Sequence, residues 1–351
     1  MKKVILLALL PLTAMAAPSL KGFEKTYQDW DLICDNTGTC NMAGYQEEGD
    51  GSEHPVSILF TRSAGEQAPV SAQLALLPED VGNKTAEIIL NGQSLGTIQN
   101  FSEEGNAKLS EKQTTELLTA LKGNASIEVI FGEFKEKVSD KGAAAAMLKM
   151  DEFQQRLNTP SALIRQGQEK HAVLAPQAAP KIEAVSVNNH KTIELKRGEK
   201  QFDTVLALLR KSNGTNEDAE NYCYELHKDD VWNKQITLYP LTKGKMLAEA
   251  ICSSSAYNYT NYYAVLDGKL SKVEQVLENR YNYADYDKDT HVLTVNGSFK
   301  GSGIGNCWSG QDAVWNGKIL IRTSEWTTGS CKGLPGGTWQ LPIFVSNVIV
   351  K

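Results

Sequence analysis

The spacing of apolar residues along the chain predicts a protein built mainly from β-strands. Residues 70–76 place an apolar side chain at every second position, as a strand with one buried face requires. Residues 86–90 and 94–98 lie on either side of Asn91-Gly92, a pair that tolerates the positive φ angles of a tight hairpin turn. We therefore expect the first half of the chain to form a β-sandwich-like domain.

Helical periodicity occurs in a few short segments and adds helices to this β framework. Ser110 precedes Gln113 at the spacing of a capping box, which predicts a helix over 110–121. A second helix is expected to begin near Asp140, and a short third helix to occupy 160–167. In the second half, one helix is predicted by an apolar face made of Phe202, Val205, Leu206 and Leu209.

Hairpin signals dominate the second half of the chain. Three pairs of a polar residue and a glycine interrupt its apolar segments: Asp267-Gly268, Asn296-Gly297 and Asn316-Gly317. Such pairs suit the turns whose twist matches that of the flanking strands. Turns at this density predict an antiparallel β-sandwich or barrel. The predicted fold class is therefore mainly β with some α.

A segment rich in alanine and proline separates the two halves. Residues 175–180 begin and end with Ala-Pro, which favours neither a helix nor a central strand. We interpret 169–186 as a linker between a domain over 17–168 and a second domain over 187–351. Limited proteolysis is then expected to cut first in the linker and to leave two stable fragments. The alternative is an ordered surface loop inside one larger domain.

Residues 1–16 have the three parts of a secretory signal peptide: a basic start, an apolar run and an A-x-A site, with cleavage expected before Ala17. The apolar run is shorter than the roughly 20 residues that span a bilayer, and no later stretch approaches that length. Cleavage would change the formal net charge from −6 to −8, because it removes Lys2 and Lys3. This charge argues against nucleic acid and anionic membranes as partners.

The six cysteines suggest disulfides, because an exported chain enters an oxidising compartment. Three bridges are predicted, the last two from proximity along the chain: Cys34–Cys40, Cys223–Cys252 and Cys307–Cys331. The first joins two predicted antiparallel strands, whose facing residues lie within reach of a bridge. The chain has no C-x-x-C motif and its five histidines are scattered, so neither a redox motif nor a zinc site is indicated. No cofactor is expected.

Two short motifs resemble ligand-binding loops, but a structural explanation is favoured for each: a flexible or bulged strand for the first and a solvated acidic turn for the second. Residues 301–305 read G-x-G-x-G rather than G-x-G-x-x-G, and they lie between predicted hairpins rather than in a βαβ unit. Asp285, Asp287 and Asp289 begin like a calcium loop, but the glycine and glutamate that such a loop needs are missing. A solvated acidic turn is favoured, with a weak calcium site as the alternative. The common hydrolase signatures do not occur, although a triad of distant residues stays open.

A concentration of tyrosines is the feature that points to binding. Five of them are candidates for a recognition surface: Tyr257, Tyr259, Tyr262, Tyr281 and Tyr283. Tyrosine offers a large contact area with a polar tip at a low cost in conformational entropy. Cross-strand aromatic pairing within a sheet is the alternative explanation.

Several stretches of sequence resemble known families. Residues 30–35, with Cys40, resemble the opening of invasion-associated locus B-like proteins. Four further stretches resemble an uncharacterised family of exported proteobacterial proteins that is filed as a domain of unknown function: Ser139–Ala145, Asp151 with Gln154–Arg156, Thr159–Gly167 and Lys300–Cys307. That family's pattern has an arginine and an aspartate where this chain has Ser302 and Asn306. A function that depended on those two charges would not carry over to this chain.

The resemblance implies a periplasmic protein of a Gram-negative bacterium with two domains, and it assigns no catalytic residues. We expect a non-enzymatic binding protein of the envelope, whose partner is an envelope protein or a glycan. An envelope hydrolase with an unrecognised site is the alternative, and an inhibitor of a lysozyme-like enzyme is a variant of the binding role. A deep pocket lined by acidic residues or histidine would favour the enzyme, whereas a flat tyrosine-rich face would favour binding. The oligomeric state is left open.

Overall fold

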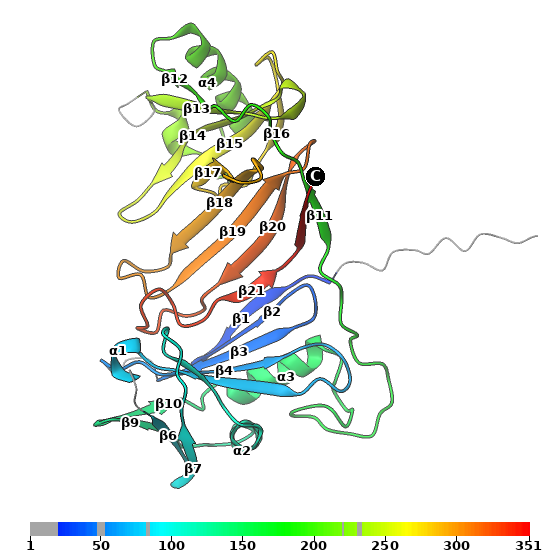
Figure 1. Ribbon diagram of the computed structural model, residues 1–351, viewed down its shortest axis with the longest axis vertical. Helices are drawn as coiled ribbons and strands as arrows, with labels where there is room; N and C mark the ends of the chain where they lie inside the picture. The colour runs from blue at the N-terminus through cyan, green and yellow to red at the C-terminus, as the bar shows by residue number, and fades with distance from the viewer. Residues whose placement is uncertain (1–19, 48–52, 82–84, 220, 230–233) are drawn as a thin grey trace, which may run out of the picture.

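The computed structural model describes residues 20–47, 53–81, 85–219, 221–229 and 234–351. The predicted signal peptide lies outside the described residues, so its cleavage before Ala17 stays a prediction. Figure 1 shows the larger sheets following one another along the long axis of the molecule. The described residues form four larger sheets and a fifth, two-stranded sheet. The fold is mainly β with some α, as the sequence predicted. None of the described sheets closes into a barrel.

Two sheets and three helices form the first half. The larger sheet has the order β1-β2-β3-β4-β5-β8: β1 (Phe23–Tyr27), β2 (Trp30–Cys34), β3 (Cys40–Tyr45), β4 (Ser57–Arg62), β5 (Val70–Ala75) and β8 (Asn106–Lys108). The smaller has the order β10-β9-β6-β7: β6 (Ala86–Leu90), β7 (Gln93–Ile98), β9 (Ile127–Phe131) and β10 (Phe134–Val138). The helices are α1 (Pro78–Val81), α2 (Glu111–Ala120) and α3 (Ala143–Phe153). Side chains from both sheets and from α2 and α3 share one apolar core.

The local predictions for the first half hold except for one helix. Asn91 and Gly92 have φ angles of 50° and 80° and close the hairpin β6–β7. Ser110 and Gln113 form the predicted capping box at the start of α2. The third helix over 160–167 was a wrong prediction, because the segment forms turns. Polar side chains bind its backbone, as described below.

The second half contains two five-stranded antiparallel sheets. One has the order β12-β13-β14-β15-β16: β12 (Ile193–Lys196), β13 (Gln235–Pro240), β14 (Met246–Ser254), β15 (Tyr259–Leu266) and β16 (Val273–Val276). The other runs in chain order: β17 (Tyr283–Tyr286), β18 (Leu293–Lys300), β19 (Trp308–Trp315), β20 (Leu320–Thr327) and β21 (Leu341–Phe344). The helices are α4 (Lys200–Asn213), α5 (Tyr224–His227) and the 3-10 turn η1 (Thr242–Gly244). The predicted apolar face of α4 is buried on the first of these sheets.

Two of the three predicted turns of the second half lie between paired strands. Asp267-Gly268 falls in the loop of hairpin β15–β16, and Asn316-Gly317 falls in the loop of hairpin β19–β20. The prediction of a turn at Asn296-Gly297 was wrong, because this pair lies inside β18. A Cβ atom at Gly297 would lie only 1.9 Å from the carbonyl oxygen of Arg280, so the glycine serves a close approach of two backbones.

The segment predicted as a linker lies against the first half and then becomes a strand. The Leu174 N–H donates to the Gln154 carbonyl at 3.0 Å, and the Leu174 carbonyl accepts from Gly65 N–H at 2.8 Å. Residues Lys181–Ala184 form β11, which pairs in parallel with β22 (Asn347–Val350) at the end of the chain. The division into two domains at 169–186 stays a prediction.

The two halves contact each other through a buried apolar cluster. Trp339 and Leu341 pack with Ile33 and Tyr45 on the face of the first sheet that points away from its main core. The Trp339 indole N–H donates to Ser57 Oγ at 2.8 Å. A fully buried tryptophan with a paired N–H makes a strong anchor. The last sheet of the second half is therefore docked on the first half.

Polar contacts surround this apolar cluster. The Asp31 carboxylate accepts hydrogen bonds from Ser330 N–H at 2.6 Å and from Ser330 Oγ at 2.9 Å. The Lys332 ammonium lies 3.0 Å from Asp29 Oδ1, and both side chains are almost buried. These contacts join residues that are 299 and 303 positions apart in sequence. They fix the orientation of one half relative to the other.

Cleavage within 169–180 is expected to leave the two halves bound to each other. The reason is that the cluster around Trp339 and the hydrogen bonds of Asp31 do not depend on the linker. Nicked protein should elute as one species in gel filtration and should separate into two fragments in concentrated urea. Nicked Trp339→Ala protein should separate at a lower urea concentration. Fragments that separate without denaturant would contradict this prediction.

Candidate functional site

The structure divides the five candidate binding tyrosines into two groups. Tyr257, Tyr259 and Tyr283 are about half exposed, at 49%, 46% and 52%. Tyr262 and Tyr281 are buried, with only 1% and 5% exposed. Three of the five tyrosines are therefore placed to meet a partner from solvent, and two belong to cores.

The two buried tyrosines belong to different cores of the second half. Tyr262 lies in the core between its sheet and α4, where its hydroxyl is 2.8 Å from Ser212 Oγ. Tyr281 lies in the core between the two five-stranded sheets, where burial raises the pKa of its hydroxyl to about 12. Both side chains belong to cores of the fold, but neither forms the cross-strand aromatic pair that the sequence offered as the alternative: Tyr262 faces Ala250 across the strands, and Tyr281 lies before β17.

Asparagines between these tyrosines fix the backbone on which the exposed rings stand. Asn258 forms two hydrogen bonds of 2.9 Å with the backbone N–H and carbonyl of Lys300. The Asn282 amide donates to the Ser298 carbonyl at 2.8 Å, and the Asn261 amide donates to the Asn282 carbonyl at 3.2 Å. The asparagines thus tie the two five-stranded sheets together, and their polar groups are occupied by the protein itself.

The exposed tyrosines lie near the ends of strands of the two five-stranded sheets, and one of them lies beside a largely exposed apolar loop residue. Ile304 is 81% exposed in the loop after β18, and Tyr257 lies next to the preceding residue, with a ring carbon 3.7 Å from where a Cβ atom at Gly303 would be. The Tyr283 hydroxyl donates to Asp285 Oδ2 at 2.8 Å, which raises the pKa of Tyr283, and Tyr259 adds a small electrostatic effect in the same direction. We call Tyr257, Tyr259, Tyr283 and Ile304 the tyrosine surface.

A carboxylate lies close to the tyrosine surface and was not predicted. Glu249 on β14 accepts hydrogen bonds from the Tyr263 hydroxyl at 2.6 Å and from the Tyr239 hydroxyl at 3.3 Å. Burial raises the pKa of Glu249, while these hydrogen bonds act in the opposite direction. Tyr263 is the direct cross-strand neighbour of Glu249, so a correct register for β14 and β15 would have revealed the pair. Glu249 and Asp285 thus place two carboxyl groups near Tyr283, and both raise its pKa.

The two motifs that resemble ligand-binding loops, residues 301–305 and 285–289, have structural roles. Gly301 lies beside the Cys307–Cys331 bridge, where a Cβ atom would be 2.6 Å from the Cys307 sulfur, so the glycine serves close packing. The Asp287 carboxylate accepts hydrogen bonds from the N–H groups of Asp289 and Thr290 and thereby caps an acidic turn. Among the described residues, no group of three or more His, Cys, Asp or Glu side chains is placed to hold a metal ion.

All six cysteines are paired as predicted, in the bridges Cys34–Cys40, Cys223–Cys252 and Cys307–Cys331. Cys34 and Cys40 face each other across the hairpin β2–β3. The other two bridges join segments that are distant in sequence and stabilise the second half.

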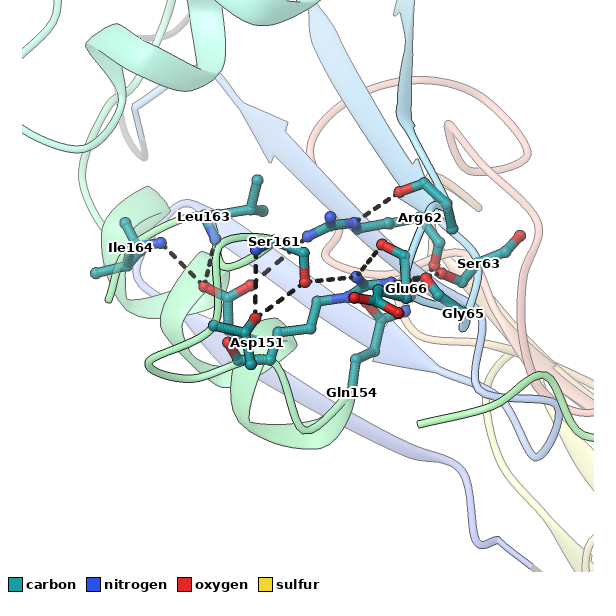
Figure 2. A network of polar contacts seen from close by, with 12 residues as sticks. Arg62, Ser63, Gly65, Glu66, Asp151, Gln154, Ser161, Leu163 and Ile164 are labelled. Atoms are coloured by element: carbon teal, nitrogen blue, oxygen red, sulfur yellow. Dashed lines mark hydrogen bonds and ion pairs between the residues drawn. The ribbon is translucent and has the colours of Figure 1, made fainter. Parts of the chain in front are cut away.

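A buried polar network explains the most specific part of the sequence resemblance. Asp151, Gln154 and Arg156 are all 0% exposed, which is unusual for such residues. Asp151 Oδ2 accepts hydrogen bonds from the N–H groups of Leu163 and Ile164 at 2.7 and 2.9 Å (Figure 2). These bonds hold residues 160–167 in turns, which is why the predicted third helix does not form.

Arg156 is the centre of this network. Its guanidinium donates five hydrogen bonds, to the carbonyls of Ser63, Gly65 and Glu66 and to the side chains of Gln154 and Ser161. Burial lowers its pKa to about 10, and the nearby charge of Arg62 acts in the same direction, whereas Asp151 opposes both effects. The arginine thus pins the segment after α3 to the loop after β4. Within the network, Arg62 Nη1 and Asp151 Oδ1 form no hydrogen bond and lie 3.7 Å apart as an ion pair. The hydrogen bonds of Arg156 all go to the protein's own groups, which makes the arginine a structural element.

The fold and these sites define a disulfide-stabilised protein of stacked sheets with an exposed tyrosine surface. The chain belongs to the DUF1176 family, whose members are proteins of unknown function and whose pattern it matches over residues 24–346. A search of curated proteins found no match. The tail fiber of Staphylococcus aureus phage P68 is similar over 86% of this chain and 67% of that chain, with 9% identity and a TM-score of 0.12. A likeness this weak supports no conclusion about fold or function.

The helices of the described residues are all too short or too polar to cross a membrane.

Proposed function

We propose that this protein is an exported, non-enzymatic binding protein of the Gram-negative envelope, which acts in the periplasm. The tyrosine surface is the binding face in this proposal, and the partner is a glycan or a protein of the envelope. The observation that carries the proposal is the exposure of Tyr257, Tyr259 and Tyr283 at about half of their surface beside a largely exposed Ile304.

The construction of the second half supports a rigid binding face. Two disulfides cross-link this half of the chain. Hydrogen bonds from Asn258 and Asn261 join its two five-stranded sheets next to the exposed tyrosines. Rigid aromatic side chains on a fixed backbone lose little entropy on binding, and this raises affinity without further contacts. The neighbouring carboxylates of Glu249 and Asp285 favour a partner that offers hydrogen-bond donors or positive charge.

The three cysteine pairs also support the proposed periplasmic location. Three disulfides in a chain of this size are typical of oxidising compartments such as the bacterial periplasm, and rare in the cytosol. The signal peptide expected over 1–16 would direct the chain there.

Replacing all three tyrosines with serine is expected to weaken binding to envelope material by about a hundredfold, because each large exposed aromatic in an interface contributes roughly 1 kcal/mol. The assay is cosedimentation of the mature protein with purified cell-wall sacculi, together with capture from solubilised envelope proteins. The matched control is Tyr224→Ser, since Tyr224 is 54% exposed and is not part of the tyrosine surface.

Equal binding by the wild-type protein and the triple variant would exclude the tyrosine surface as the binding face. Release of soluble fragments from the sacculi by the wild-type protein would instead favour the hydrolase alternative. Inhibition of lysozyme in the same mixture would identify the inhibitor role as the form that binding takes.

A further inference from the structure

A cavity of about 120 Å³ lies where the two halves of the chain meet. Glu24 on β1 contributes from the first half. The charged, polar and aromatic side chains from the second half are those of Arg280, Phe299, Gln311, Glu325 and Trp326. A second hollow of about 280 Å³ shares Glu24 and continues along the junction. These hollows share no lining residue with the tyrosine surface, so an inference about them does not depend on the proposed function.

Gln311 is a buried side chain whose polar atoms have no partner. It is 3% exposed, and neither its Nε2 nor its Oε1 forms a hydrogen bond with any described residue. Buried amides in native proteins are almost always hydrogen-bonded, so each exception requires an explanation. Gln154 shows the usual case, because its amide nitrogen donates to two carbonyls and its oxygen accepts from Arg156. Gln311 lines the cavity and keeps both a donor and an acceptor unused.

Glu24 is the carboxylate at this cavity whose oxygens have no direct partner, although the charge of Arg280, which also lines the cavity, acts on it. Glu325 is already paired with Arg280, at 3.3 Å, and with Arg322. Asp31 in the adjoining hollow accepts hydrogen bonds from Thr26 and from Ser330. Glu24 forms neither an ion pair nor a hydrogen bond with any residue that the structure describes.

The surroundings of Glu24 favour a positive charge beside it. Glu24 is exposed on one side, and its partial burial against the cavity raises its pKa. The charges of Asp31 and Glu325 add to this effect, while Arg280 opposes it. A cation placed against this carboxylate would relieve the repulsion between the acidic groups. The rings of Phe299 and Trp326 in the same wall offer apolar contact and an attractive face for a cation.

We propose that this cavity binds a small protonated amine that carries an oxygen on a neighbouring carbon. The ammonium group is bound by the Glu24 carboxylate and by Gln311 Oε1, and Gln311 Nε2 donates to the oxygen. Phe299 and Trp326 contact the carbon skeleton. A cavity of about 150 Å³ accepts a molecule as large as benzene, so this cavity suits the amine-bearing end of a ligand, with room for more along the second hollow. An amino sugar and an α-amino acid amide both present this chemistry.

Isothermal titration of the mature protein tests the proposal with two amine probes, glucosamine and alaninamide. Glucose and N-acetylalaninamide serve as their neutral counterparts. At least one amine is expected to bind at least about tenfold more tightly than its counterpart, because a hydrogen bond to a charged group is worth about one decade in affinity. The amine that binds identifies the source of the ligand. Equal binding of each amine and its neutral counterpart, or saturable binding by neither amine, would overturn the proposal.

Two variants test the assigned residues. Gln311→Met keeps the side chain's length without its amide, and Glu24→Gln removes the charge. Each is expected to weaken amine binding about tenfold, whereas Glu194→Gln on the exposed strand β12 is the control and should bind as the wild type does. Gln311→Met should unfold at the same or a higher urea concentration in the absence of ligand, because it removes an unpaired buried amide. A less stable Gln311→Met protein, or unchanged binding by both variants, would overturn the assignment.

The same titration separates this proposal from the proposed function. The triple tyrosine variant should bind the amine as tightly as the wild-type protein, even if it loses the envelope partner. Loss of amine binding in the triple variant would overturn the assignment of the amine to the junction cavity.

Discussion

Replacing Arg156 with alanine is expected to lower the free energy of unfolding by about 3–5 kcal/mol, the usual cost of removing one partner from a buried charged network. The guanidinium is fully buried and donates five hydrogen bonds, three of them to backbone carbonyls of the loop after β4. Its removal takes a hydrogen bond from each of those carbonyls and from the Gln154 oxygen, and of the three carbonyls Gly65 keeps a bond from Ala68 N–H at 3.1 Å. Asp151 also loses one of the two positive charges that offset its burial.

Urea unfolding of the whole chain measures this loss, with the wild-type slope as a check that the same surface is exposed. Arg165→Ala is the matched control, because Arg165 lies in the same segment with an exposed side chain and should change stability by no more than about 0.5 kcal/mol. Arg156→Lys keeps the charge but not the planar set of donors, so it should fall between the two. A loss below about 1 kcal/mol for Arg156→Ala would show that the network does not hold the segment after α3.

This network marks a limit of prediction from the sequence. The capping box at Ser110, the apolar face of α4 and the hairpin at Asn91-Gly92 are local features, and local features were predicted correctly. The turns over 160–167 depend instead on backbone N–H groups that donate to the Asp151 carboxylate, twelve and thirteen residues away. A hydrogen bond between residues this far apart leaves no pattern in the neighbouring sequence. Pro160 at the start of the segment therefore led to the prediction of a helix.

The burial of the tyrosines could not be predicted from alternation alone. Alternation separates one covered face from one exposed face, but both faces of β15 are covered along most of its length. Tyr262 enters the core beneath α4, and Tyr263 enters the core between the sheets. Tyr259 is exposed because it stands at the first residue of the strand, at the edge of both cores. The ends of a strand, rather than its period, decide which tyrosines reach solvent.

The contacts between the two halves could not be predicted from the sequence either. Glu24 and Gln311 line one cavity although nearly the whole chain separates them in sequence. The partners of Trp339 come from the first sheet, and nothing in its neighbourhood along the chain indicates that contact. Asn296-Gly297 has the composition of a turn, yet a second backbone crosses it, and this approach explains the glycine better than a turn does. Each of these features depends on docking between segments that are distant in sequence.

The disulfides of the second half are expected to stabilise the protein more than the bridge of the first half does. Cys223–Cys252 and Cys307–Cys331 close sequence separations of 29 and 24 residues, while Cys34–Cys40 closes a separation of 6. In the chain-entropy model, the two longer loops correspond to about 3.5 kcal/mol each and the short loop to about 2 kcal/mol. Loop length alone therefore favours the second-half bridges.

The surroundings of the bridges widen this difference. Cys34 and Cys40 are direct neighbours in the hairpin β2–β3, which its backbone hydrogen bonds and the core beneath it also hold. Cys223 lies at the start of α5, a helix of only 4 residues, and the bridge to Cys252 fixes it to β14 within the buried core. Losing this bridge removes the covalent link between α5 and β14 and leaves the segment to side-chain hydrogen bonds such as those of Arg210 and Asn213. Losing Cys34–Cys40 leaves a paired hairpin in place.

We therefore expect Cys223→Ser/Cys252→Ser protein to lose about 3 kcal/mol or more of unfolding free energy, and Cys34→Ser/Cys40→Ser protein to lose about 2 kcal/mol or less. Replacing both partners avoids a free thiol that could form a wrong bridge. Urea unfolding compares the variants, and peptide mapping without reducing agent confirms the two remaining bridges in each. An equal or larger loss for the Cys34–Cys40 variant would contradict this ranking, because it would show that the hairpin β2–β3 depends on its bridge more than α5 does.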